Sequence, residues 1–151
     1  MGRGACWATT SGATNGTDLN ANAPDCRFHI ASWSPDKQTI AFSSYRSGNR
    51  DIWTTPVTGG AARQLTDSPA ADLQPSWSPD GKRIAFLSNR VGSGAVWIVP
   101  SEGGPATEVK ASRPMNEPRW SPDGMWVVAQ SEGGLLRLSP TETAPEIQIA
   151  R

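Results

Sequence analysis

The side chains that could do chemistry are few, and their spacing forms no known catalytic motif. A Ser-His-Asp triad needs a histidine as its base, and His29 is the single histidine of the chain. The sequence has no Gly-x-Ser-x-Gly elbow, phosphate-binding loop, His-Glu-x-x-His motif or Asp-rich calcium loop. Asp36, Asp80 and Asp123 recur, but each lies in a Ser-Pro-Asp turn, where an aspartate accepts backbone hydrogen bonds. We therefore predict no catalytic residue and no cofactor.

The two cysteines, Cys6 and Cys26, also lack the additional ligands that a metal site needs. Two cysteines and one histidine are too few ligands at this spacing. A disulfide between them would close a loop of about twenty residues and stabilise the fold by roughly 3 kcal/mol. We favour two free thiols, because residues 1–16 contain no apolar segment typical of an export signal. Such a start fits either a cytoplasmic protein or a chain whose true beginning has been removed.

Composition narrows the class of protein further. The 151 residues include fourteen Lys and Arg and fourteen Asp and Glu, so the formal net charge is zero. Binding to duplex nucleic acid needs a clustered basic excess, and we predict no nucleic-acid partner. No apolar run approaches the ~20 residues that cross a bilayer. Fifteen Gly, thirteen Pro and seven Trp indicate a turn-rich, all-β protein.

A repeat of about 44 residues organises the elements that must position any site. Three segments begin with Trp-Ser-Pro-Asp, at Trp33, Trp77 and Trp120, and their spacings are 44 and 43 residues. The 44-residue period continues downstream in three further pairs: Arg46 and Arg90, Trp53 and Trp97, and Gly59 and Gly103. Agreement at so many positions indicates a repeat architecture.

Each unit predicts four short antiparallel strands. In the second unit the first strand ends at Trp77-Ser78, and the others follow 83–88, 95–99 and 106–109, with turns rich in Gly, Pro and Asp between them. The middle strands are continuous apolar runs, as expected for strands that are covered on both faces. Four such strands in about 44 residues are typical of one blade of a β-propeller.

The predicted organisation is an N-terminal segment, 1–28, followed by blades over 29–72, 73–115 and 116–151. A remnant of a preceding blade is one interpretation of the N-terminal segment. Lys37 stands where the other units have glycine, and a left-handed lysine there would cost on the order of 1 kcal/mol unless the turn changes type. The third unit lacks the long loop between its second and third strands, and its last strand is predicted over 146–150.

The pattern Trp-Ser-Pro-Asp-Gly-Lys-x-Ile-Ala-Phe-x-Ser-x-Arg, followed by an Asp-Ile-Trp strand and Gly-Gly, resembles the TolB-like propeller repeat. Residues 73–109 match nearly every marker, residues 29–66 match apart from Lys37, and 118–151 match in their first half. The resemblance implies a propeller of usually six blades and a periplasmic location. Similar blades occur in prolyl-oligopeptidase and tricorn-type peptidases. Our leading hypothesis is a non-catalytic propeller segment that acts as a scaffold for protein–protein interaction. An accessory piece of such a hydrolase is the alternative, and a small-ligand or glycan-binding propeller is a weaker alternative.

Three blades cannot close a ring, because closed propellers need at least about four. Leaving two apolar blade faces in water would cost about 10 kcal/mol, which is comparable to the stability of a whole domain. Two copies could complete a six-bladed ring as a homodimer, further blades could do so in a longer protein, or the N-terminal segment could seal an open arc. We therefore predict a protein partner or a second copy of the chain.

A partner would meet the loops after the second strands and the loops between blades. The resemblance likens Arg46 to the family's Ser-x-Arg arginine and Asp51 to its Asp-Ile-Trp aspartate, and we predict that the two pair to brace the blade. Arg90 has Ala95 at the matching position, and we expect it to be freer to meet a ligand. The predicted partner-binding face consists of Tyr45, Arg46, Arg50, Asp51, Asp72, Arg90, Arg113, Met115 and Asn116.

Overall fold

The computed structural model describes residues 30–141 and 146–150, and these residues form twelve strands and no helix. The strands make three separate four-stranded antiparallel sheets, each built from four consecutive strands. The prediction of an all-β chain with three four-stranded units is confirmed. We call the sheets blade 1, blade 2 and blade 3.

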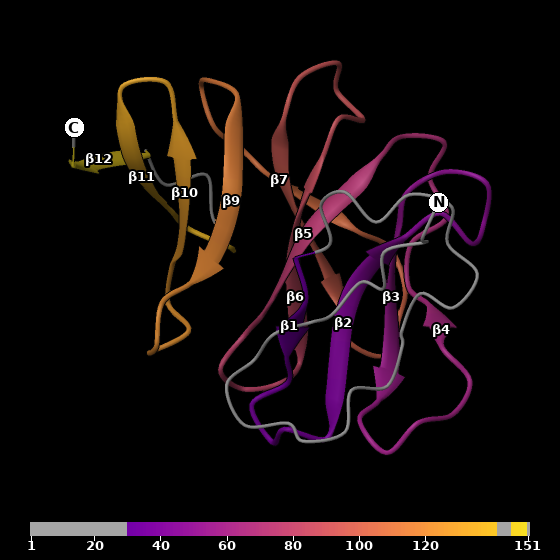
Figure 1. Ribbon diagram of the computed structural model, residues 1–151. Helices are drawn as coiled ribbons and strands as arrows, with labels where there is room; N and C mark the ends of the chain where they lie inside the picture. Colours follow the sequence, from indigo (N-terminus) through magenta and orange to yellow (C-terminus); the bar gives the residue numbers. More distant parts are fainter. Residues whose placement is uncertain (1–29, 142–145, 151) are drawn as a thin grey trace, which may run out of the picture.

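The strands follow one another in the same order in every blade. Blade 1 contains β1 (Ser32–Trp33), β2 (Thr39–Ser44), β3 (Asp51–Pro56) and β4 (Arg63–Gln64). Blade 2 contains β5 (Asp72–Trp77), β6 (Arg83–Ser88), β7 (Ala95–Pro100) and β8 (Thr107–Val109). Blade 3 contains β9 (Met115–Trp120), β10 (Val127–Ser131), β11 (Gly134–Leu138) and β12 (Ile147–Ala150). Figure 1 shows the blades side by side, with the β2–β3, β6–β7 and β10–β11 loops at one end, which we call the loop end.

Blade 2 is covered on both faces, which explains why its middle strands are apolar throughout. Ile84, Phe86 and Val99 pack in one core with side chains of blade 1. Ala85 and Ile98, which alternate with them along the strands, pack in a second core with blade 3. Successive side chains of a strand point to opposite faces, so a strand between two neighbours needs apolar residues at every position.

Polar contacts that recur at both blade interfaces fix how the blades stack. The backbone N–H of Trp77 donates to Ser32 Oγ at 3.1 Å, and the N–H of Trp120 donates to Ser76 Oγ at 3.3 Å. The guanidinium of Arg83 in blade 2 lies 4.5 Å from the ring centre of Trp120 in blade 3. The residue before the repeated tryptophan therefore supplies an acceptor to the next blade.

The Ser-Pro-Asp turns lie at the opposite end of the blades and are held by their aspartates. Asp36 Oδ1 accepts from Ser34 Oγ at 2.5 Å and from the N–H of Gln38 at 3.0 Å. Asp80 repeats this pattern with Ser78 at 2.5 Å and the N–H of Lys82 at 3.0 Å. The predicted role of these aspartates as local acceptors is confirmed, and Asp123 does the same in blade 3.

Lys37 keeps the turn type of the other blades despite its side chain. Its φ is 60°, and the matching glycines, Gly81 and Gly124, have φ of 70°. The N–H of Lys37 donates to Ser34 O at 2.9 Å, as the N–H of Gly81 does to Ser78 O. Blade 1 therefore carries the strain of a left-handed residue with a Cβ.

Lys37→Gly is expected to raise the free energy of unfolding by about 0.5–1 kcal/mol. The left-handed strain of about 1–2 kcal/mol is removed, and the added flexibility of glycine in the unfolded chain offsets part of the gain. Urea unfolding followed by tryptophan fluorescence measures the change. The reverse change in the same turn of blade 2, Gly81→Lys, should lower stability. A destabilised Lys37→Gly variant would contradict this account of the turn.

Candidate functional site

The loop end gathers all nine residues predicted to form the partner-binding face, but at different depths. Tyr45, Arg46, Arg113 and Asn116 are exposed, and Arg50 and Arg90 are half-buried. Asp51 and Asp72 have no exposed surface, and Met115 is only 1% exposed. Their expected place on the surface was wrong, because each is the first residue of a strand and its side chain is enclosed by its neighbours. These three residues therefore belong to the packing beneath the surface.

Asp51 is held by neighbours other than Arg46. Its carboxylate accepts from Ser47 Oγ, from Gln64 Nε2 at 3.0 Å and from Thr66 Oγ1 at 3.4 Å. Arg46 instead lies over aromatic rings of its own blade, 5.4 Å from the ring centre of Phe42. The predicted pairing of Arg46 with Asp51 was wrong, because a hydroxyl of the β2–β3 loop and the side chains of Gln64 and Thr66 already surround the carboxylate.

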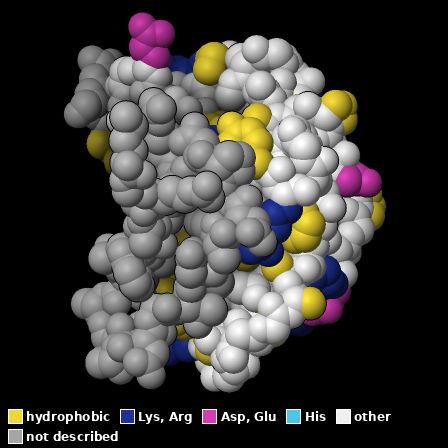
Figure 2. Space-filling model, turned by 45° about the vertical axis from the view of Figure 1, so that its right-hand side comes forward, with side chains coloured by type: hydrophobic (Ala, Val, Ile, Leu, Met, Phe, Trp, Pro, Cys, Tyr) yellow, Lys and Arg dark blue, Asp and Glu magenta, His cyan; other side chains and the backbone are white. Residues whose placement is uncertain are grey.

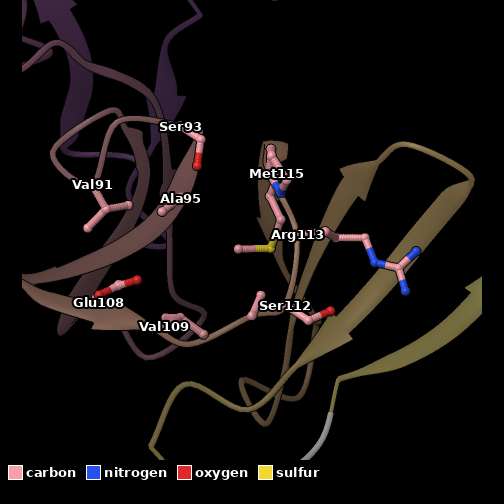
Figure 3. A pocket seen from close by; sticks show the side chains of 11 residues that line it. Val91, Ser93, Ala95, Glu108, Val109, Ser112, Arg113 and Met115 are labelled. Atoms are coloured by element: carbon pink, nitrogen blue, oxygen red, sulfur yellow. The ribbon is translucent and has the colours of Figure 1, made fainter.

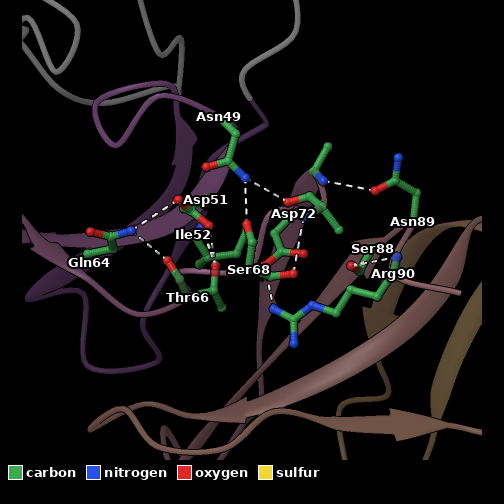
Figure 4. A network of polar contacts seen from close by, with 12 residues as sticks. Asn49, Asp51, Ile52, Gln64, Thr66, Ser68, Asp72, Ser88, Asn89 and Arg90 are labelled. Atoms are coloured by element: carbon green, nitrogen blue, oxygen red, sulfur yellow. Dashed lines mark hydrogen bonds and ion pairs between the residues drawn. The ribbon is translucent and has the colours of Figure 1, made fainter.

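Arg90 is also engaged, contrary to the expectation that it would be freer than Arg46. Its Nη2 lies 2.6 Å from Asp72 Oδ2, and the side chain is 19% exposed while that of Asp72 is fully buried. The guanidinium also lies 4.8 Å from the ring centre of Trp97. Figure 4 shows the contact between Arg90 and Asp72. The partner of Arg90 was missed because it comes eighteen residues earlier, at the start of β5.

Two asparagines that the sequence did not single out tie the hairpin loops to the segment between blades 1 and 2. Asn49 Nδ2 donates to the carbonyl oxygens of Ser68 at 2.6 Å and Ala70 at 2.9 Å. From the other side, Asn89 Oδ1 accepts from the N–H of Ala71 at 2.8 Å (Figure 4). Both ends of the segment are thus fixed, and the backbone beneath the exposed side chains is preorganised.

The exposed part of the loop end is mixed in character. The guanidinium of Arg50 lies 4.8 Å from the ring centre of Tyr45, whose side chain is 37% exposed, and Val91 is 51% exposed. Arg113 Nε lies 3.3 Å from Glu146 Oε1, which joins the blade 2–3 segment to the residue before β12. Figure 2 shows hydrophobic and charged side chains scattered among backbone and other side chains on the described part of one face.

The interface between blades 2 and 3 differs from that between blades 1 and 2 at the loop end. Ala95 and Met115 stand at the places of Asp51 and Asp72, and the N–H of Met115 donates to Gly94 O at 2.9 Å as that of Asp72 does to Arg50 O at 2.8 Å. A pocket of about 140 Å³ opens between these blades. Figure 3 shows Ser93 and Ala95 on one side of it and Met115 on the other.

Two further expectations concern metals and membranes. Within residues 30–141 and 146–150, no group of three or more His, Cys, Asp or Glu side chains is arranged to hold a metal ion. The same residues contain no helix that could span a membrane. Cys6, Cys26 and His29 lie outside the described residues.

The free energy of unfolding is expected to fall as the pH drops below 3.8, the ordinary pKa of an aspartate. Hydrogen bonds, first of all from the neighbouring serine hydroxyls, lower the pKa of Asp36, Asp80 and Asp123. Their stabilisation is present above the unfolded pKa and is lost as the pH falls through the lower folded values. Burial, followed by the charge of Asp72, raises the pKa of Asp51, so protonation there acts in the opposite direction.

The measurement is the thermal midpoint between pH 5 and about pH 2, a window that spans the titration of the turn aspartates. A variant with Asp36→Asn, Asp80→Asn and Asp123→Asn keeps an oxygen acceptor in each turn without a titrating group. We expect its midpoint to fall less steeply with acid than that of the natural chain. Identical pH dependence of the two chains would show that these turns do not control acid stability.

Three four-stranded blades stacked face to face, with the repeated tryptophan at each interface, define a segment of a β-propeller. The TolB beta propeller domain family matches residues 15–144, and the chain belongs to that family.

Solved structures agree with the fold. A structure described as a TolB of Agrobacterium tumefaciens is 25% identical with a TM-score of 0.63, covering 78% of this chain and 41% of that one. TolB from Acinetobacter baumannii is 21% identical with a TM-score of 0.69, covering 82% of this chain and 32% of that one. A puromycin hydrolase is 20% identical with a TM-score of 0.65, covering 83% of this chain and 22% of that one. The chain thus spans less than half the length of each of these proteins.

Proposed function

We propose that this propeller segment binds a protein partner at its loop end and does no chemistry itself. The observation that carries the proposal is the Tyr45–Arg50 pair, an exposed aromatic ring stacked against a guanidinium 4.8 Å away. Tyrosine and arginine are enriched at protein interfaces, and a tyrosine ring offers a large contact area at a small cost in conformational entropy.

The polar groups beneath this pair support binding over catalysis. Asp51 accepts from three side chains, and Asp72 is paired with Arg90, so both of these buried carboxylates act on the fold itself. The bonds of Asn49 to Ser68 and Ala70 hold the adjoining segment in place. A surface that is already ordered loses little entropy when a partner binds.

Completion of a ring by a second copy or by further blades is the second candidate. It is favoured by exposed apolar side chains on the outer strands of blade 3, where Leu135 is 39%, Ile147 43% and Ile149 51% exposed. Strand pairing places Arg119 at the position of Ser32 and Ser76, which accept the next blade's Trp N–H. A blade stacked on blade 3 would need a different contact there. Sedimentation equilibrium tests this candidate, because a monomer at micromolar concentration would exclude the dimer.

An accessory role in a peptidase or another hydrolase is the alternative, suggested by the likeness to puromycin hydrolase. An α/β-hydrolase coding sequence downstream would favour it.

The proposal is tested by placing the photo-crosslinking residue p-benzoylphenylalanine at Tyr45 and, as a matched control, at Lys82. Lys82 is exposed at the opposite end of the blades, in the Ser-Pro-Asp turn of blade 2. We expect a discrete adduct in extracts of the source cells from position 45 alone. Excess natural chain should suppress it, and the Tyr45→Ala/Arg50→Ala chain should not. Equal adducts at both positions, or equal competition by both chains, would refute the proposal.

A further inference from the structure

The two blade interfaces place different side chains at one equivalent loop position. The loops 45–50 and 89–94 have the same length, and each contains a glycine whose N–H donates to the residue three before it, Gly48 to Tyr45 O at 3.0 Å and Gly92 to Asn89 O at 2.9 Å. Asn49 in the first loop therefore corresponds to Ser93 in the second. A carboxamide at one interface is replaced by a much shorter hydroxyl at the other.

At the first interface, the Asn49 carboxamide crosses from blade 1 to the segment that leads into blade 2. Its Nδ2 donates to two backbone carbonyl oxygens, those of Ser68 and Ala70. A primary carboxamide suits this place because it offers two N–H donors on one nitrogen. The first interface thus shows which chemical group fits between a hairpin loop and the segment after the fourth strand.

At the second interface the corresponding space is hollow. Ser93, Gly94 and Ala95 stand where Asn49, Arg50 and Asp51 stand at the first, so three large polar side chains are replaced by small ones. The resulting pocket of about 140 Å³ is lined by these three residues and, across from them, by the segment 111–115. Figure 3 shows the open space between Ser93 and Met115.

The lining of the pocket offers acceptors and apolar surface. The Ser112 hydroxyl and N–H both donate to Glu146, and Arg113 also contacts that carboxylate, so these polar groups are engaged outside the pocket. Figure 3 shows the Arg113 guanidinium directed away from the hollow. In the repeat, the segment 111–114 corresponds to the one that contains Ser68 and Ala70, whose carbonyl oxygens accept from Asn49 at the first interface. The Glu108 carboxylate also lines the pocket, where it is paired with Lys110, and Val109 adds apolar surface.

We propose that the pocket between blades 2 and 3 binds a primary carboxamide, as carried by an Asn or Gln side chain of a partner chain. The carboxamide nitrogen donates to backbone carbonyls of the segment 111–114, and the apolar stem packs against Ala95, Val109 and Met115. That the carboxamide comes from a partner chain rests on the proposed function. The binding of a carboxamide in the pocket can be tested without any partner. The first interface supplies its own carboxamide, and the second takes one from outside.

Two isosteric substitutions test the preference for a donor. Ser93→Asn places in the pocket the side chain that the first interface contains, and it should raise the thermal midpoint by about 2–4 °C, as expected for one hydrogen bond in a chain of this size. Ser93→Asp has the same shape but only acceptors, and it should leave the midpoint unchanged or lower it. Equal effects of the two substitutions would overturn the proposal.

Acetamide and acetate test the pocket directly on the natural chain. Acetamide should produce saturable shifts of the backbone N–H signals of Gly94, Ala111 and Ser112 in ¹H–¹⁵N spectra, and acetate should not. Ser93→Asn should abolish the acetamide shifts, and Asn49→Ser should create a second acetamide site at the first interface. Absent shifts, equal shifts with acetate, or shifts that persist in Ser93→Asn would each refute the pocket. If Ser93→Asn does not fold, the comparison of acetamide with acetate decides. Failure of the crosslink at Tyr45 alone would leave this result unaffected, so the two proposals fail separately.

Discussion

Arg90→Ala is expected to lower the free energy of unfolding by about 3–5 kcal/mol, although Arg90 lies in a loop. The substitution removes the cation 2.6 Å from Asp72, whose side chain is fully buried. Breaking a buried ion pair by deleting one partner leaves a charge that neither water nor protein compensates. The arginine also covers the rings of Phe86 and Trp97, so its loss exposes part of the blade 1–2 core.

The third blade supplies the control for this prediction. Met115 occupies the position of Asp72, and the shorter β10–β11 loop of that blade has no arginine to match Arg90. Removing both charges, in Asp72→Met/Arg90→Met, should therefore cost much less than Arg90→Ala, because no isolated charge stays buried. Urea unfolding measures all three chains. If Arg90→Ala costs less than about 1 kcal/mol, the scale of a surface pair, the structural importance assigned to the pair is wrong.

Gly94→Ala is expected to lower the free energy of unfolding by about 2–3 kcal/mol. An added Cβ would lie 2.5 Å from the carbonyl oxygen of Met115, and backbone cannot move aside as a flexible side chain can. Gly94 O also accepts the N–H of Met115 at 2.9 Å, so any shift that relieves the clash weakens this link between blades 2 and 3. Overpacking at such a close approach costs a few kcal/mol.

The neighbouring exposed residue provides the control. Ser93→Ala changes the same loop without an added Cβ and should alter stability by less than about 0.5 kcal/mol. The equivalent position in blade 1 is Arg50. The segment between β4 and β5 is one residue longer than the segment between β8 and β9, because the matching residues Gln64 and Glu108 are 44 positions apart and Asp72 and Met115 only 43. A Gly94→Ala chain as stable as Ser93→Ala would contradict the close approach of the two backbones.

The sequence predicted the fold because the strands repeat with a period and end at turns of distinctive chemistry. The strand predicted over 83–88 is β6, and the one predicted over 146–150 is β12, which begins at Ile147. Each Ser-Pro-Asp turn closes on itself through contacts within five residues, so local residue types are enough to define it. Lys37 departs from the glycine found at this position in the other two turns, and its turn nevertheless keeps the same conformation.

The candidate site was harder to predict because its contacts join residues distant in sequence. Arg90 pairs with a residue eighteen positions earlier, and Asn49 reaches carbonyls nineteen and twenty-one positions later. Asp51 was placed on the surface because it borders a loop, yet the side chains of Ser47, Gln64 and Thr66 surround its carboxylate. The pocket between blades 2 and 3 is a space lined by small residues. The sequence indicates such a space only when the residues at the two blade interfaces are compared.

Nuclear Overhauser contacts between neighbouring Ser-Pro-Asp turns test the stacking of the blades most directly. A Cβ on Gly124 would lie 3.6 Å from Pro79 Cδ, and one on Gly81 would lie 3.8 Å from Pro35 Cδ. The α-protons of each glycine should therefore show strong contacts with the δ-protons of the proline in the preceding blade. Their presence at both interfaces is the result we predict. Well-dispersed spectra in which both contacts are missing would show that the repeats fold without stacking in this way.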